Sequence, residues 1–276
     1  MISQSCIASY HGTTLNRGGS FLYIAPHICL RPYISNYTIT FPTPQTMPDA
    51  YTILPTASST LAVRCSDDGI DSKLRGVDTK ATQVGVYANK MKLLLLIEFL
   101  PGGMHPFIRV DPSELVDSSV PLHDLDGSLV QMVENELIKA DRIEALVEAM
   151  DRIFLSRLSE QAADPMVSAV LRHISMQHGN IDAKGLSNAF HYSEKHLRRL
   201  FCRHVGVSPK LFSRIVRANH ALRLIQRQPQ AFANIAAQAG FFDQPHMIRD
   251  FKSICGLTPE QYLQNMSVYY NDHYKL

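Results

Sequence analysis

Near the C-terminal end of the chain, apolar residues recur at the spacing of one buried helix face and are interrupted by glycine turns. Met247, Phe251 and Ile254 stand at i, i+4 and i+7, so they form one stripe along a predicted helix. Asp243 precedes that helix as an N-cap, and Gly240 supplies the positive φ that ends the helix before it. Two short helices joined by a tight turn, the second with polar and basic residues outward, are the pattern of a helix-turn-helix unit.

The same pattern occurs fifty residues earlier in the chain. The residues Phe201, Gly206, Pro209 and Phe212 stand fifty positions before Phe251, Gly256, Pro259 and Tyr262. Before the predicted recognition helices the offset falls to forty-nine, so the second turn holds one extra residue, Phe242. An internal repeat is strong evidence, because chance would have to produce the same pattern twice. The chain is therefore predicted to carry a tandem pair of helix-turn-helix units, at about residues 183–205 and 232–255.

A long helix is predicted between the two units. Pro209 opens it, and Phe212, Ile215 and Leu222 supply its apolar face. Asp182 and Ser193 are the predicted caps of the two helices in the first unit. One stiff connection of this kind holds the two recognition helices at a fixed separation.

Residues 1–110 show short apolar runs bounded by Pro, Gly, Asp or Ser, which is typical of strands. The runs are Tyr37–Phe41, Tyr51–Leu54, Leu61–Val63, Gln83–Tyr87 and Leu93–Phe99. Frequent prolines between the runs favour turns and sheet edges. These runs predict a sandwich or a small barrel. The glycine loop that follows the last run is interpreted as a turn leaving a buried strand, with the rim of a ligand pocket as the alternative.

From Leu129 to Leu158 the apolar period becomes helical, and Asp141 is the expected cap that divides this stretch into a hairpin at about 127–159. The polar stretch Ser159–Pro165 then places a domain boundary near residue 162. The predicted fold class is α+β with two domains. Residues 1–162 form a β-rich, sandwich-like or barrel-like domain with the helical hairpin, and residues 163–276 form an all-α tandem helix-turn-helix domain.

The C-terminal part closely resembles the AraC/XylS family of bacterial transcription regulators. The resemblance covers about residues 166–265 and is carried by Ile235-Ala236, Gly240-Phe241, Phe251-Lys252, Gly256, Thr258-Pro259 and Tyr262, and by Ser193, Leu197, Phe201 and Gly206-Val207-Ser208-Pro209. His191 departs from the glycine usual in the first turn, but His tolerates the left-handed region better than most residues. The resemblance implies an effector-binding N-terminal domain and a dimerising or linking helical hairpin. A hairpin that only covers the β-domain is equally compatible with the sequence.

The family's DNA-reading positions, carried over residue by residue, give a candidate site. They fall on Lys195, Arg198 and Arg199 in the first recognition helix, and on Gln244, His246 and Arg249 in the second. Arg can bond guanine bidentately and Gln can bond adenine. The candidate phosphate contacts are Ser193, Lys210, Arg214 and Lys252, and Arg217 and Arg223 are further basic candidates. Because Arg199 and Arg249 are repeat equivalents, a shared structural role competes with base reading for both.

The charge of the chain is divided unevenly between the two predicted domains. The net charge is only +2, but residues 1–160 carry 13 Lys and Arg against 18 Asp and Glu. Residues 161–276 carry 14 against 7. The C-terminal part is therefore the basic one, as binding to the DNA backbone requires.

Several other functional classes are not expected. The five cysteines are odd in number and include no C-x-x-C pair, which argues against a disulfide framework or a zinc cluster. Histidines 11, 27, 105 and 123 are scattered, so no metal site is expected, and no grouping of catalytic residues or cofactor motif stands out. The first twenty residues lack a signal-peptide pattern, and no apolar run is long enough to span a bilayer. These observations predict a cytoplasmic protein that is not an enzyme.

The sequence therefore predicts a sequence-specific transcription regulator. Its expected partners are double-stranded DNA, a small-molecule effector at the N-terminal domain, RNA polymerase and a second copy of the chain, and no membrane. Two alternatives remain open from the sequence. One is a DNA-binding module fused to an unrecognised enzymatic domain, and the other is an architectural DNA binder that needs no ligand.

Overall fold

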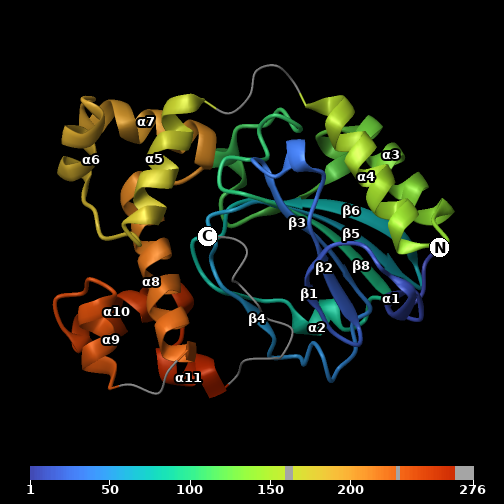
Figure 1. The fold of residues 1–276 in the computed structure, drawn as a ribbon, viewed down its shortest axis with the longest axis horizontal. Coiled ribbons are helices and arrows are strands. Elements are labelled where there is room, and N and C mark those ends of the chain that lie inside the picture. Colours follow the sequence, from blue (N-terminus) through green and yellow to red (C-terminus); the bar gives the residue numbers. More distant parts are fainter. Residues whose placement is uncertain (159–163, 228–230, 265–276) are drawn as a thin grey trace.

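The computed structural model describes residues 1–158, 164–227 and 231–264. Figure 1 shows a sheet-containing part on the right and an all-helical part on the left, with one long helix, α8 (Pro209–Arg227), running through the helical part. The prediction of a β-rich N-terminal domain followed by an all-α C-terminal domain is confirmed. The boundary predicted near residue 162 lies outside the described residues.

The N-terminal part contains a seven-stranded antiparallel sheet in the order β1-β2-β3-β8-β5-β6-β9. Its strands are β1 (Thr14–Arg17), β2 (Phe21–Ile24), β3 (Ile34–Thr40), β5 (Thr60–Ser66), β6 (Gly69–Arg75), β8 (Leu93–Phe99) and β9 (Ser119–Pro121). A separate two-stranded ribbon pairs β4 (Thr52–Ile53) with β7 (Thr82–Gln83). The strongest predicted run, Leu93–Phe99, is the strand β8 at the centre of the sheet.

The predicted strand Gln83–Tyr87 is wrong over most of its length. Only Gln83 belongs to β7, and the following residues form the short helix α2 (Gly85–Ala88). The amides of Val84 and Gly85 both donate to the carbonyl of Tyr51, which turns the chain. A Cβ on Gly85 would lie 1.9 Å from the carbonyl oxygen of Pro48, so only glycine fits this close approach. The strands β1, β2, β6 and β9 were not predicted. In β1, β6 and β9 polar residues interrupt the apolar ones, whereas β2 is an apolar run, Phe21–Ile24, that the prediction omitted.

The predicted helical hairpin is present and covers one face of the sheet, which is one of the two arrangements that the sequence left open. It consists of α3 (Gly127–Lys139) and α4 (Ile143–Arg157), and their buried side chains join the main core with those of the sheet. The expected cap of the second helix is wrong. Arg142 rather than Asp141 occupies the N-cap position of α4 and makes no side-chain cap bond. The Asp141 carboxylate is 84% exposed and lies 3.8 Å from the Arg142 guanidinium.

The helical part follows the predicted repeat. Its remaining helices are α5 (Pro165–Met176), α6 (Ala183–Phe190), α7 (Glu194–Val205), α9 (Phe232–Gln238), α10 (Gln244–Cys255) and α11 (Pro259–Gln264). Asp182, Ser193 and Asp243 cap α6, α7 and α10 with their side chains, as predicted. His191 adopts φ 57° and ψ 32°, so the first turn does use the left-handed region.

The two parts share a hydrophobic core. Leu54, Ala57 and Val77 of the N-terminal part are buried together with Phe212 and Ile254 of the helical part. Short elements complete the N-terminal part: α1 (Cys6–Ser9), η1 (Ile28–Leu30), η2 (Pro112–Leu115) and η3 (Leu122–Asp124). Of these, η2 packs against α7. Within the described residues, no helix is both long and apolar enough to cross a membrane.

Candidate functional site: a DNA-binding surface

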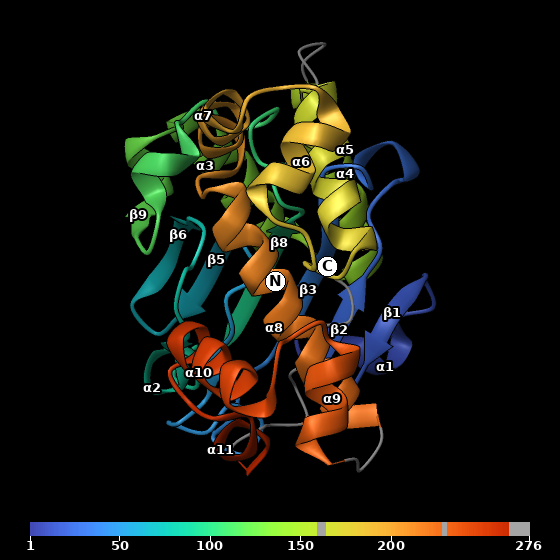
Figure 2. The ribbon, with the colours of Figure 1, turned by 90° about the vertical axis from the view of Figure 1, so that its left-hand side faces the viewer.

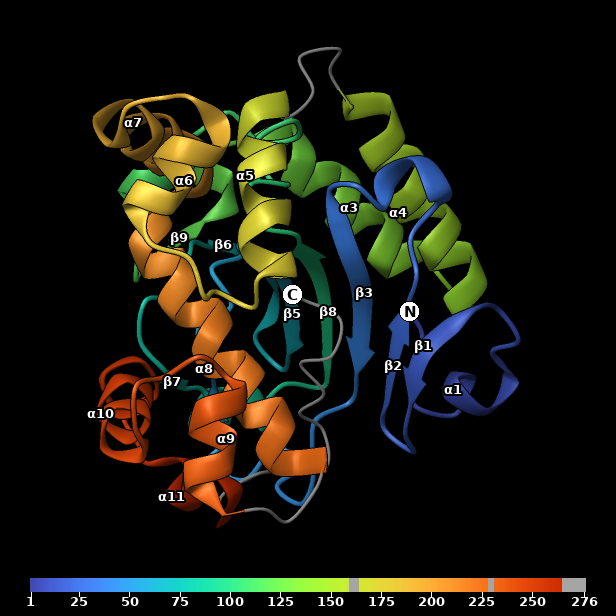
Figure 3. The same ribbon diagram turned by 60° about the vertical axis from the view of Figure 1, so that its left-hand side comes forward.

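The two predicted recognition helices, α7 and α10, lie on the same side of α8. Figures 2 and 3 show α7 towards one end of α8 and α10 towards the other, both on the left of the view. A helix of 19 residues is ~28 Å long at 1.5 Å per residue. That length approaches the ~34 Å between successive major grooves on one face of a duplex. The length of the connecting helix is therefore comparable with the separation that a two-groove site requires.

The first recognition helix keeps its basic residues outward. Its apolar face, with Leu197 and Phe201, is buried against the helical core. The predicted reading residues Lys195, Arg198 and Arg199 are all exposed. Lys195 and Arg198 also line one groove with Lys210 at the start of α8, so three predicted contacts lie on one surface.

The candidate phosphate contact Ser193 already has a local role. Its hydroxyl oxygen accepts from the amide of His196 at 3.3 Å, which caps α7. The hydroxyl proton is still available for a phosphate oxygen, because a hydroxyl both donates and accepts. The His196 ring stacks on Tyr192 at 4.9 Å between centroids, which gives this histidine a structural contact within the unit.

The second recognition helix also presents polar residues outward. Arg249 and Lys252 are exposed, and Gln244 is half-buried at the first position of α10. The His246 ring is partly buried: its Nδ1 accepts from the amide of Phe242 at 3.3 Å, and the ring stands edge-on to Phe241. Because Nδ1 is the acceptor, the neutral ring carries its proton on Nε2, which can donate to a base edge.

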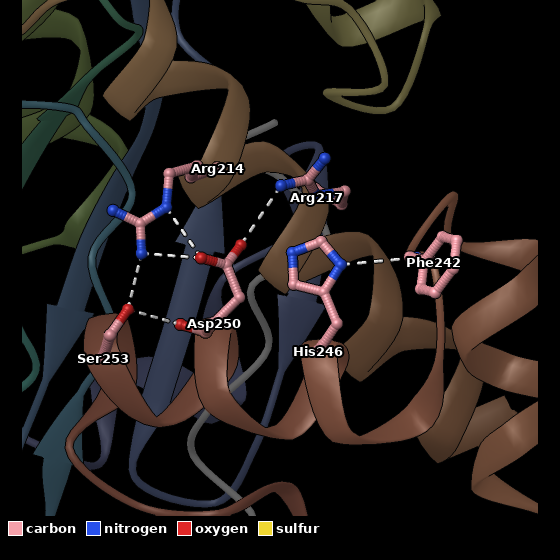
Figure 4. Close-up of polar contacts among 6 residues, drawn as sticks. All are labelled: Arg214, Arg217, Phe242, His246, Asp250 and Ser253. Carbon is pink, nitrogen blue, oxygen red and sulfur yellow. Dashed lines mark hydrogen bonds and ion pairs between the residues drawn. The ribbon is translucent and has the colours of Figure 1, made fainter.

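An ion-pair cluster holds α10 against α8. Asp250, which is 9% exposed, accepts from Arg214 Nε at 2.7 Å and from Arg217 Nη2 at 3.2 Å (Figure 4). Arg214 Nη2 also donates to Ser253 Oγ at 2.6 Å, and the Arg217 guanidinium lies 4.7 Å from the centre of the Phe241 ring. A buried carboxylate that bonds two guanidinium groups fixes the orientation of α10 on its supporting helix.

This cluster changes the roles of residues considered from the sequence. Arg214 and Arg217 were candidate phosphate contacts, and in the structure both guanidinium groups are directed onto Asp250. Asp250 itself was missed by the sequence analysis. A signal was present, because its repeat equivalent fifty positions earlier is the apolar Leu200. An acidic residue at a position where the repeat has leucine indicates a buried charge with a dedicated partner.

The N-terminal part contacts the far end of α7. A Cβ built on Gly206 would lie 2.9 Å from the carbonyl oxygen of Pro112 in η2. The His105 and His204 rings lie 5.5 Å apart across the same contact. Burial lowers the pKa of His204, and the neighbouring His105 lowers it further. This contact involves the C-terminal end of α7, whereas the exposed residues predicted to read DNA lie nearer its N-terminal end.

The predicted loop after β8 forms part of this contact. Gly102 adopts φ 73°, and a Cβ there would lie 3.6 Å from the carbonyl oxygen of His204. The loop lines a cleft between the two parts that Val167, Leu171 and other residues of α5 complete. The glycine turn leaving a buried strand is therefore present, and its outer side faces the helical part.

Comparison with known families identifies the helical part. Residues 186–265 match the family model described as a helix-turn-helix domain, which is the AraC-type module. The C-terminal part is an AraC-type helix-turn-helix domain. Residues 23–121 match a second family model, described only as a domain of unknown function (DUF6597). The AraC-type domain thus contains both candidate recognition helices, whereas the second match covers most of the sheet and no part of the helical domain.

Curated relatives share part of this chain. An uncharacterized HTH-type transcriptional regulator of Escherichia coli (strain K12), YidL, is 37% identical over 73 residues, which are 26% of this chain and 25% of YidL. Another, YbfI of Bacillus subtilis (strain 168), is 31% identical over 136 residues, 49% of this chain and 48% of YbfI. The chain thus spans about half or less of the length of these relatives. Among solved structures, ToxT of Vibrio cholerae aligns over 90% of this chain and 99% of the ToxT chain, at 11% identity. The TM-score of this alignment is 0.44, which does not establish a shared overall fold.

Proposed function

We propose that this protein is a sequence-specific DNA-binding transcription regulator of the AraC type. The observation that carries the proposal is the tandem pair of capped recognition helices, α7 and α10, on one side of a single 19-residue helix. Each recognition helix buries its apolar face and leaves polar side chains outward. A helix presented in this way can enter the major groove and read base edges.

The proposed base contacts are those of the two exposed faces. On α7 they are Lys195, Arg198 and Arg199, and on α10 they are Gln244, His246 and Arg249. The proposed phosphate contacts are Ser193 at the N-cap of α7, Lys210 at the start of α8 and Lys252 on α10. We now assign Arg214 to the support of α10 rather than to a phosphate, because Asp250 and Ser253 hold its guanidinium.

Regulation by a ligand at the N-terminal domain is the second part of the proposal. Asn219 of α8 donates from Nδ2 to the carbonyl of Pro55 at 3.0 Å, and the amide of Ala81 donates to the carbonyl of Ile254 at 3.1 Å. Leu54 lines a cavity on the sheet and also packs in the core shared with α8. A ligand in that cavity would alter DNA binding by favouring one arrangement of the two domains over another.

The proposal includes three further elements. RNA polymerase is a proposed partner of a regulator that acts on transcription, and a bacterial cytoplasm is the proposed location. A homodimer is proposed through the α3–α4 hairpin, where Ile138 is 51% exposed. An enzyme fusion and an architectural role are not favoured, because the curated relatives are named as regulators.

Selection of bound DNA from a random pool tests the proposal. The full chain is expected to select one long asymmetric consensus that spans about two helical turns, ~20 base pairs. The Arg198→Ala variant should relax one half of that consensus and Gln244→Ala the other half, each by about 1–3 kcal/mol at one base pair. Arg152→Ala, an exposed position on α4, is the matched control and should leave the consensus unchanged.

Two results would contradict the proposal. One is a pool that shows no preference above that for random DNA, since a regulator should prefer its site by ~10³ or more. The other is a consensus confined to a single half-site that neither variant alters, which would exclude two reading helices.

A further inference from the structure

A cavity of about 410 Å³ lies on the face of the sheet opposite the α3–α4 hairpin. Side chains alternate between the two faces of a strand. On β8, Leu95 and Ile97 join the core beneath the hairpin, whereas Leu94, Leu96 and Glu98 line the cavity. Its volume lies within the range of small-molecule sites, roughly 300–1,000 Å³.

The roof of the cavity is mainly apolar. It is formed by the segment that carries β4 and by α2 with its flanking residues, including Met47, Tyr51, Ile53, Val84 and Met91. Met47 and Tyr51 are buried and pack with the sheet at one end of the cavity. A ligand that fits here must therefore have an apolar body.

Strand pairing places the residues of the floor in rows across the sheet. The strand registers give one row of Asn36, Glu98, Thr60 and Arg75, and a neighbouring row of Thr38, Leu96, Ala62 and Lys73. The row that contains Glu98 is thus polar throughout. The neighbouring row is apolar at its centre, at Leu96 and Ala62, and ends at the cation Lys73. Glu98 on β8 and Lys73 on β6 belong to different rows, with β5 between their strands.

Two of the three basic residues on the β5–β6 side of the cavity have acidic partners. Arg64 Nε donates to Asp71 at 3.1 Å, and the Arg75 guanidinium bonds both carboxylate oxygens of Asp78 at 2.7 and 2.8 Å. These pairs neutralise the two arginines, so they contribute little net charge to the cavity.

Lys73 is the third basic residue, and its charge is not balanced in this way. Its neighbours on the adjacent strands are Ala62 and Pro121, which offer no side-chain acceptor. Within residues 1–158, 164–227 and 231–264, no hydrogen bond or ion pair to the Lys73 ammonium is present. A half-buried ammonium group at the wall of a largely apolar cavity attracts an anion more strongly than it would in water.

The opposite side of the cavity carries an acceptor. Glu98 is 7% exposed, and its Oε2 accepts from Asn36 Nδ2 at 2.8 Å. Asn36 Nδ2 also donates to Thr38 Oγ1 at 2.8 Å, which fixes the amide. An ionised carboxylate has about four acceptor sites, so Glu98 can also accept from a hydroxyl or amine of a ligand.

The separation of these two groups sets the size of the ligand. Two strand spacings and two residue steps place the Cα atoms of Lys73 and Glu98 ~12 Å apart. Both side chains line the same cavity, so one small organic molecule lying over the sheet can reach both groups.

We propose that this cavity binds a small organic anion. Its anionic group is held by the Lys73 ammonium, its apolar body lies over Leu96 and Ala62 beneath the roof, and a hydroxyl or amine at its other end donates to Glu98. The proposed function is needed only for the further step that this anion is the effector that regulates DNA binding. Binding itself is a property of the N-terminal domain and is measured without DNA.

Calorimetric titration of the full chain with matched probes tests the proposal. The probe 3-(4-hydroxyphenyl)propionate carries a carboxylate, an aromatic body and a hydroxyl at the far end. Tyramine has the same ring and hydroxyl but an ammonium group, and 3-phenylpropionate lacks the hydroxyl. The first probe is expected to bind at least tenfold more tightly than tyramine and several-fold more tightly than 3-phenylpropionate.

Substitutions assign the two ends of the probe. Lys73→Met removes the charge but keeps the apolar stem, and it should weaken binding of 3-(4-hydroxyphenyl)propionate at least tenfold. Lys139→Met, the same change on α3 beyond the other face of the sheet, should leave binding unchanged. Glu98→Gln should remove the advantage of the hydroxylated probe over 3-phenylpropionate.

Three results would overturn the proposal. They are preferential binding of tyramine, binding of the carboxylate probe that is indifferent to Lys73→Met, and the absence of binding by that probe at millimolar concentration. Failure of the DNA selection would not alter these titrations. Conversely, a clear DNA consensus with no probe binding would leave the regulator proposal intact and reject this one.

Discussion

Replacing Asp250 by alanine removes the carboxylate that joins α10 to α8. Two guanidinium groups would then remain at the same place, one with an 18% exposed side chain at Arg217 and one with a 33% exposed side chain at Arg214. Removing one member of a buried ion pair costs about 3–5 kcal/mol, because the remaining charge is left uncompensated. The partial exposure of Arg214 allows water to reach that group, so we expect a cost near ~3 kcal/mol.

Chemical denaturation of the full chain measures this cost. The chain contains no tryptophan, so circular dichroism at the helix band is the suitable signal. Glu136→Ala is the matched control, because it removes a carboxylate from the exposed pair with Lys139. An exposed pair of this kind is worth less than ~1 kcal/mol.

A compensating variant separates the charge effect from the loss of packing. Asp250→Leu installs the residue found at the equivalent position of the first unit, and Arg214→Met with Arg217→Met removes the two cations. Replacement of a whole buried ion cluster by apolar residues is often neutral or stabilising. The triple variant should therefore recover most of the stability that Asp250→Ala loses.

DNA selection with Asp250→Ala should show a weakened preference at the half-site read by α10, with the half-site of α7 preserved. The reasoning would be refuted by a stability loss below ~1 kcal/mol for Asp250→Ala. It would also be refuted by a triple variant that is less stable than the single one, because the cost would then not come from uncompensated charge.

Three further predictions follow from the contacts between the two parts. Burial, followed by the neighbouring His105, lowers the pKa of His204 below its ordinary 6.5, so the unfolded chain binds the proton more tightly. The contribution of His204 to stability is therefore present above pH ~6.5 and is lost as the pH falls through the folded pKa. The difference between the urea midpoints at pH 7.5 and at pH 5.5 should accordingly be smaller in His204→Gln than in the unmodified chain. Asn219→Ala should cost about 1–3 kcal/mol, because it leaves the carbonyl of Pro55 without its donor. The variant should be cleaved faster by protease between the two domains, and an unchanged cleavage rate would contradict the prediction. Gly206→Ala, at φ 91°, should cost about 1–2 kcal/mol in denaturation, whereas Gly127→Ala, at an open position without positive φ, should not.

The sequence by itself determined the elements whose causes are local. The caps Asp182, Ser193 and Asp243 precede their helices directly, and the left-handed positions that end the same helices are His191, Gly206 and Gly256. An apolar period of 3.6 residues needs no distant partner to be recognised. For this reason the tandem repeat and the connecting helix could be predicted, together with the basic character of the C-terminal part.

Only the tertiary structure decided the features that join distant residues. The strand order brings β3 beside β8, the Asp250 cluster joins residues more than thirty positions apart, and Leu54 packs against α8 in a core shared by both parts. The cavity depends on strand register, since a shift of one residue would turn Glu98 and Lys73 to the other face. Short-range periodicity carries no information about such pairings, because their energy comes from contacts formed only when the chain is folded.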